Sequence, residues 1–249
     1  LTGSYFALPQ FIGRASSFDT DVIETDNIGK QVPSDIEGGI DLPFKTRFQL
    51  HALYILLTSN ERGIFYYSPV VLIGLLGLCL LYKRKLALRG ILTVIFAVIL
   101  FNTFVYSMFG DSSGGWAYGA RYMIPAVALL SVGIGIAFSE YGRKLWFIPI
   151  FLTFTAYSIG VNVLGAVTTT QVPPKVEAVN LPDPIPYTYE YNWQLMTEKN
   201  LNSSLVYNLY LSDHLSSKDF ALIYASAAFG LVMILYFVSF FENPPSHKA

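Results

Sequence analysis

Charged residues are scarce in this sequence. Only 13% of its 249 residues are Asp, Glu, Lys or Arg, and 53% are hydrophobic, whereas about a quarter of the residues in an ordinary soluble domain are charged. The formal net charge is −1, which gives no sign of the basic surface that nucleic-acid-binding proteins use, so we expect no nucleic-acid partner. This composition is typical of an integral membrane protein.

Cysteine and clustered histidine are also lacking. Cys79 is the single cysteine, so an intrachain disulfide is excluded, and its place in an apolar run predicts a small buried hydrophobe. No Cys/His group has the spacing of a metal site. The pair Asp19-Thr20-Asp21 is a D-x-D arrangement that could hold a divalent metal on a sugar phosphate; the alternative is a chance pair in an acidic loop. We therefore assign no cofactor and leave a divalent metal as the open alternative.

The apolar runs that are present define the fold class. A bilayer-spanning helix needs about 20 apolar residues, and such runs cover about 63–82, 90–109, 121–138, 145–167 and 220–241. The shorter apolar piece 48–58 predicts an interfacial or re-entrant helix. We expect an all-α, multi-pass integral membrane protein with about five transmembrane helices, an interfacial helix and outer loops.

Basic residues in the short loops predict the orientation. Lys and Arg concentrate in the loops 83–89 and 142–144, whereas the loops 110–120 and 168–218 have no basic excess, so the basic side and the C-terminus should face the cytoplasm of a plasma membrane. The first residue is Leu1 and the polar opening would lie outside, so we expect the chain to be part of a longer protein. The expected segments are an outer polar loop (1–50), a four-helix transmembrane part with outer site loops (51–167), an outer Pro- and Tyr-rich loop (168–218), and a last helix with a cytoplasmic tail (219–249).

The cores of the five runs contain no Asp, Glu, Lys or Arg. Intramembrane ionisable residues mark ion paths and proton relays, so their absence from these runs argues against an ion-coupled transporter. Asn102 and Asn162 are the notable polar residues in the runs, and we expect interhelical hydrogen bonds from them. The small residues Ser131, Gly133 and Gly135 predict a close helix contact.

A polar, glycine-rich stretch at 110–125 carries the first candidate site residues. Arg121 stands at the start of the third run, where a guanidinium and free backbone N–H groups would converge on a phosphate. Trp116 and Tyr122 offer aromatic faces of the kind that sugar and lipid sites use. The alternative is an aromatic belt with a snorkelling arginine. Asp111, the only acid in this turn, could be a base, a metal ligand or a turn residue.

A second stretch, 60–69, has the same character, and we expect both stretches to form one site for an anion with a greasy or sugar-like body. Here Arg62 could reach that anion or pair close to Glu61, with Tyr67 following; the alternative is interfacial anchoring. The candidate substrate-binding residues are therefore Arg62, Tyr67, Asp111, Trp116, Arg121 and Tyr122, and no catalytic residue is assigned. Asn202-Ser203-Ser204 matches the N-glycosylation sequon, a short motif that also arises by chance.

The two stretches together resemble a known group of membrane proteins. RGIFYYSP at 62–69 resembles the segment R-G-L/I-F-x-Y-S-P, and GGWAYGARYMIP at 114–125 is similar to G-G-W-S-F/Y-G-P-R-F/Y-L-x-P, which follows one helical hairpin later in GT-C-type glycosyltransferases. Ala117 and Ala120 depart from that pattern, where serine and proline are common, but the arginine and the glycines are kept. The resemblance covers about residues 43–140.

The resemblance implies a membrane glycosyltransferase that transfers a sugar from a polyprenyl-phosphate donor, a lipid partner, on the outer face. In that family the catalytic acid lies in the first outer loop, upstream of the first motif, and nothing in this sequence corresponds to it. This chain therefore resembles a C-terminal part only, in which Arg62 and Arg121 are carried over as contacts to the donor phosphate.

A non-enzymatic function is the alternative. A chain without intramembrane charges or an acid–base pair also suits a non-catalytic integral membrane subunit of a cell-envelope complex, with partner membrane subunits docked on the 168–218 loop. A transporter ranks last because coupling charges are lacking in the runs.

Overall fold

The structure is a computed structural model that describes residues 50–84, 86–108 and 113–242. The chain divides into two units, Leu1–Pro43 and Phe44–Ala249, and every described residue belongs to the second. The expected outer segment 1–49, with Asp19 and Asp21, and the candidate residue Asp111 lie outside the described residues. The described part is helical and contains no strand.

Four of the described helices are long and apolar enough to cross a membrane. They are α4 (Arg89–Ser107), α5 (Ile124–Tyr141), α6 (Phe147–Val167) and α9 (Ser217–Glu242). The helix α3 (Val70–Arg84) is a shorter apolar helix beside them. The predicted fold class, an all-α multi-pass membrane protein, is confirmed.

The first expected span, 63–82, is not one continuous helix. It is divided at Ser68-Pro69 into a short helix α2 (Ile64–Tyr67) and α3, because proline lacks the N–H that a continuing helix would need and its ring clashes with the preceding turn. Asn162 of α6 supplies hydrogen bonds at this break. Its Nδ2 donates to the Ser68 hydroxyl at 3.0 Å and to the Tyr67 carbonyl at 3.4 Å. The expected bond between helices from Asn162 is thereby confirmed. Asn102 of α4 likewise donates to the carbonyl of Tyr122 at 3.0 Å.

The segment 168–218, expected as an outer loop between two spans, contains short helices, and its position outside the membrane stays a prediction. It contains α7 (Lys175–Val179), α8 (Tyr189–Glu198) and a π-helical turn (Tyr207–Leu211). The helix α8 begins three residues after Pro186, the last proline of the segment, and the Thr188 hydroxyl caps it by accepting from the Glu190 N–H at 3.2 Å. Such a cap satisfies one of the free N–H groups of the first turn.

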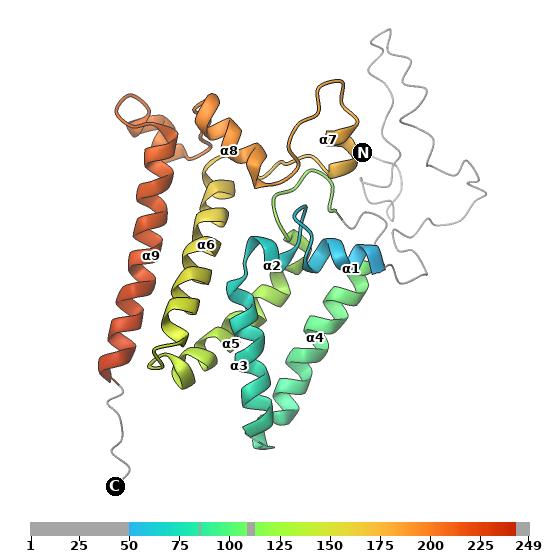
Figure 1. Cartoon of the computed structure of the whole chain (residues 1–249), viewed down its shortest axis with the longest axis vertical. Helices are drawn as coiled ribbons and strands as arrows, with labels where there is room; N and C mark the ends of the chain where they lie inside the picture. Colours follow the sequence, from blue (N-terminus) through green and yellow to red (C-terminus); the bar gives the residue numbers. More distant parts are fainter. Residues whose placement is uncertain (1–49, 85, 109–112, 243–249) are drawn as a thin grey trace, which may run out of the picture. The chain divides into compact units, whose positions relative to one another are not determined.

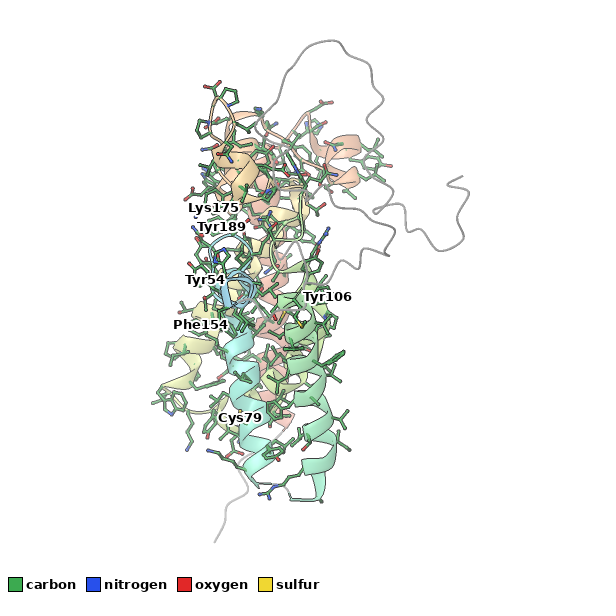
Figure 2. The ribbon with its side chains drawn as sticks, turned by 90° about the vertical axis from the view of Figure 1, so that its right-hand side faces the viewer. Tyr54, Cys79, Tyr106, Phe154, Lys175 and Tyr189 are labelled. Carbon is green, nitrogen blue, oxygen red and sulfur yellow. The ribbon has the colours of Figure 1, made fainter. Side chains whose placement is uncertain are left out.

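The helices form a bundle with its polar segments at one end (Figure 1). There α1 (Leu50–Leu57) lies across the end of α4 beside α2, and α7 and α8 lie at the same end of the bundle, whereas the α3–α4 and α5–α6 connections lie at the opposite end. The interfacial helix expected at 48–58 is thus a helix of the predicted short length; its position at a membrane surface stays a prediction. Figure 2 shows Lys175 and Tyr189 toward the polar end and Cys79 toward the other.

The closest helix contact is between α3 and α5. A Cβ on Gly77 would overlap the carbonyl of Gly133, and one on Gly133 would overlap the carbonyl of Gly74. The predicted contact at Gly133 is confirmed. A Cβ added to Gly135 would meet no atom within 4 Å, so Gly135 is not part of this helix contact and the prediction for it was wrong. Cys79 was also expected to be buried and is exposed, because α3 turns its glycines toward α5 and a helix rotates each further residue by about 100°.

Candidate functional site

Arg62 joins the two polar stretches of the sequence. Its side chain is 1% exposed, and each of its three guanidinium nitrogens donates to backbone carbonyls. The acceptors, at 2.8 to 3.3 Å, are the carbonyls of Glu61, Ser113, Gly115, Val172, Pro173 and Tyr187. The expectation that the stretches 60–69 and 110–125 come together is therefore confirmed, and the 168–188 segment joins them.

This geometry gives Arg62 a structural role. A planar guanidinium with five N–H donors suits a cage of carbonyls better than any other side chain. Its neighbour Glu61 is also buried and accepts the Lys175 N–H at 2.9 Å through Oε1, which ties α7 to the same point. Arg62 is thus directed at the backbone, whereas the sequence suggested a contact to a bound phosphate.

Tyr67 and Tyr118 form an aromatic wall next to Arg62. The Tyr67 hydroxyl donates to the Glu61 carbonyl at 3.1 Å, and its ring meets the rings of Tyr118 and Tyr189 edge-on at centroid distances of 5.3 and 6.2 Å. The Tyr118 hydroxyl donates to the Val161 carbonyl, and its ring packs on Gly165 of α6, where a Cβ would overlap it. Burial raises the pKa of both phenols well above the usual range, so both remain hydrogen-bond donors at neutral pH.

The glycines of the 113–120 turn have a left-handed backbone conformation. Gly114 and Gly119 have φ values of 75° and 62°, in the region where only glycine is unstrained. Gly119 faces the Tyr67 ring, and Gly114 lies against the Arg121 side chain. The turn therefore packs closely against the Tyr67 ring at Gly119 and against the Arg121 side chain at Gly114.

Arg121 is exposed, and its guanidinium lies over the ring of Tyr122. It begins a 3-10 turn, Arg121–Met123, and α5 starts only at Ile124; the expected helix N-terminus at Arg121 is thus displaced, because Pro125 suits the first turn of a helix but not its interior. The guanidinium carbon lies 5.1 Å from the centroid of the Tyr122 ring, and Tyr122 stacks on Tyr106 at 4.4 Å. Cation–π contact of this kind orients the guanidinium without neutralising it.

A cavity of about 600 Å³ opens beside Arg121. Three of the predicted residues line it: Tyr67, Trp116 and Arg121. Tyr122 supports Arg121 from behind, and Arg62 belongs to the backbone cage. The rest of the lining consists of Ile64, Ser68, Ala117, Tyr118, Gly119, Ala120, Ile124, Val127, Asn162, Thr170 and Gln171.

The cavity is amphipathic. Thr170 and Gln171 line it together with the half-exposed Trp116, whose indole N–H donates to the Glu177 carboxylate at 2.6 Å. Ile124 and Val127, from the first turn of α5, line it on the apolar side. Thr170 and Gln171 were missed in the sequence because no local pattern marks them. Their segment is held at the site by the Val172 and Pro173 carbonyls that Arg62 binds and by the Ala117 N–H, which donates to the Val172 carbonyl. The arrangement can accept an anion at Arg121 and an apolar chain along α5.

Asn202, the candidate glycosylation residue, has a structural role. It is 7% exposed, and its Nδ2 donates to the buried Ser217 hydroxyl at 3.1 Å while its Oδ1 accepts the Ser204 N–H at 2.8 Å. A glycan would be attached at this same nitrogen. The structure therefore favours a link between the π-helical segment and α9, and glycosylation stays an untested prediction.

Within the described ranges no group of three or more His, Cys, Asp or Glu side chains could hold a metal ion. The D-x-D pair lies outside them, so the divalent-metal alternative stays open. Comparison of the chain with family models, with curated proteins and with solved structures finds no match.

Proposed function

We propose that the chain is a GT-C-like membrane glycosyltransferase, or the C-terminal part of one, and that its cavity of about 600 Å³ binds the phosphate end of a polyprenyl-phosphate-linked sugar. One observation supports this most directly: an exposed, ring-supported arginine lies at the mouth of a cavity with both a polar and an apolar side. Polyprenyl-phosphate sugars have the same order of parts, with a phosphate between a sugar and a long hydrocarbon chain.

In this proposal Arg121 binds the phosphate, Trp116 with Thr170 and Gln171 faces the sugar, and Ile124 with Val127 contacts the first isoprene units. An acceptor hydroxyl oxygen bonds to the anomeric carbon, the bond from that carbon to the phosphate oxygen breaks, and the hydroxyl proton passes to a base upstream of this chain. Charge then grows on the leaving phosphate, where Arg121 stabilises it. In this proposal the reaction takes place at the outer face of a plasma membrane, and the C-terminus lies in the cytoplasm.

The test is donor binding by Arg121→Ala in nanodiscs, with polyprenyl monophosphate as the probe. A hydrogen bond to a charged group contributes about 1.5–3 kcal/mol, so the affinity should fall about 10- to 100-fold, and sugar transfer by the full-length protein should fall by orders of magnitude. Arg89→Ala is the matched control, because Arg89 stacks on Tyr82 at 5.7 Å in the same manner at the opposite end of the bundle. Equal affinities of Arg121→Ala and wild type would refute the phosphate site.

The alternative, a non-catalytic membrane subunit, differs from the proposal in the transfer assay. Such a subunit would bind the lipid phosphate through Arg121, but transfer in membranes of the native cell would not depend on Arg121 when a separate transferase is present.

A further inference from the structure

A second cavity lies between α6, α8 and the start of α9, and the proposed function does not use it. Its volume is about 590 Å³. Val161 and Leu164 of α6, with Ala221 and Ala225 of α9, give it an apolar floor. Because α6 and α9 are both membrane-spanning helices, the floor continues into the apolar part of the bundle. Residues Tyr189, Glu190, Trp193 and Met196 of α8 also line the cavity, and α8 lies at the polar end of the bundle (Figure 1).

The rim of this cavity is charged with both signs. Glu190 of α8 and Lys218 and Asp219 of α9 line it, and all three side chains are exposed. The Lys218 ammonium lies 5.8 Å from the centroid of the Trp193 ring, and both residues line the cavity. The Asp219 carboxylate accepts the Ser216 hydroxyl at 2.7 Å and keeps capacity for further donors. One cation and two anions thus lie above an apolar channel.

We propose that this cavity is a binding site for a phospholipid with a zwitterionic, primary-amine headgroup, such as phosphatidylethanolamine. The lipid phosphate pairs with Lys218, the primary ammonium donates to Glu190 and Asp219, and one acyl chain lies along the floor formed by α6 and α9. Each charge on the headgroup then has an opposite charge on the rim, which is the arrangement that gives selectivity.

The rim chemistry discriminates between headgroups. An anionic phosphatidylglycerol would bring a phosphate to Lys218 but leave both carboxylates unpaired beside it. A choline headgroup carries the same charges as ethanolamine but has no N–H to donate to a carboxylate. The expected order of affinity is therefore ethanolamine first, then choline, then glycerol.

The site is separate from the one in the proposed function. Tyr67 lines the first cavity and Tyr189 the second, and their rings meet edge-on at 6.2 Å, so tyrosines form the partition between the two. The lipid site does not depend on Arg121, and either proposal can fail without the other.

The experiment measures lipid binding by the intact chain with native mass spectrometry, after release from nanodiscs that contain equal amounts of phosphatidylethanolamine, phosphatidylcholine and phosphatidylglycerol. The wild type should retain phosphatidylethanolamine roughly tenfold over phosphatidylcholine. Glu190→Gln should clearly reduce this preference while total lipid binding persists, because one of the two carboxylates is removed, whereas Lys218→Gln should weaken both lipids and keep the preference. Asp219 is left unchanged because it also bonds Ser216 at the start of α9.

A cavity-filling variant provides an independent test. Gly160 of α6 lines the cavity, and a Cβ there meets no atom within 4 Å, so Gly160→Leu should fill the space without strain and remove the bound lipid. Gly135→Leu is the control, since Gly135 of α5 is equally open and does not line either described cavity. Equal retention of all three lipids by the wild type, or an unchanged preference in Glu190→Gln, would overturn the proposal. Retention by Gly160→Leu would also do so, because it would indicate an annular lipid.

Discussion

Gly77 of α3 and Gly133 of α5 meet backbone to backbone, with no room for a Cβ on either residue. Lipid tails are as apolar as the side chains of a membrane helix, so such helices associate through close packing rather than through a hydrophobic driving force. The contact is therefore what brings α5, and the Arg121 turn that precedes it, to the helix α3 that follows Tyr67.

The first prediction concerns this contact. Gly77→Val should lower the free energy of unfolding in mixed detergent micelles by about 2 kcal/mol or more, since a side chain forced into a filled space displaces backbone. Gly135→Val is the control, because it places the same side chain where no atom lies within 4 Å, and its unfolding curve should match that of the wild type. Equal losses in both variants would show that the cost comes from valine in a helix and not from the contact.

The second prediction concerns the carbonyl cage around Arg62. Arg62→Lys keeps the charge but not the planar fork, so several of the carbonyls of Ser113, Gly115, Val172, Pro173 and Tyr187 lose a donor. We expect a loss of about 3 kcal/mol in the free energy of unfolding and faster limited proteolysis within residues 168–188.

Arg89→Lys serves as the control for the cage, because Arg89 is exposed and its Nε donates to one carbonyl, that of Tyr82, at 3.1 Å. It should change neither stability nor the proteolysis pattern. If Arg62→Lys resists protease as well as the wild type does, the structural role of Arg62 is contradicted, and Arg62 would again be a candidate contact for a bound phosphate.

The sequence was a good guide wherever the deciding information is local. Apolar runs of bilayer length predicted α4, α5, α6 and α9, because hydrogen bonding of the backbone within each helix is independent of its neighbours. The isolated amides Asn102 and Asn162 predicted bonds between helices for a similar reason: each is costly in an apolar run unless it has a partner.

Residues whose role depends on distant segments could not be predicted in the same way. An arginine in a carbonyl cage has the same local sequence as an exposed one, and five of the six acceptors of Arg62 lie 51 to 125 positions away. Gly133 and Gly135 differ only in which side of α5 they occupy, and the partner that distinguishes them is α3. Trp116 and Arg121, which line the first cavity, stand beside glycines in a local pattern that the sequence shows, whereas Thr170 and Gln171 have no such pattern.

The last prediction follows from the buried phenols. Burial raises the pKa of Tyr67 and Tyr118 above the ordinary value of about 10, and the Arg62 guanidinium opposes this shift at Tyr67 without cancelling it. The folded state then keeps protons that the unfolded chain releases, so the contribution of the two phenols to stability is complete below pH 10 and is lost as the pH rises above it.

The free energy of unfolding of the wild type should fall steeply above pH 10, and the double variant Tyr67→Phe/Tyr118→Phe should show a shallower fall. Its stability near neutral pH should drop by about 2 kcal/mol, because two hydrogen bonds to backbone carbonyls are removed. Parallel alkaline slopes in the two proteins would mean that these phenols ionise as freely in the folded state as in the unfolded chain, and the aromatic wall would then be open to water.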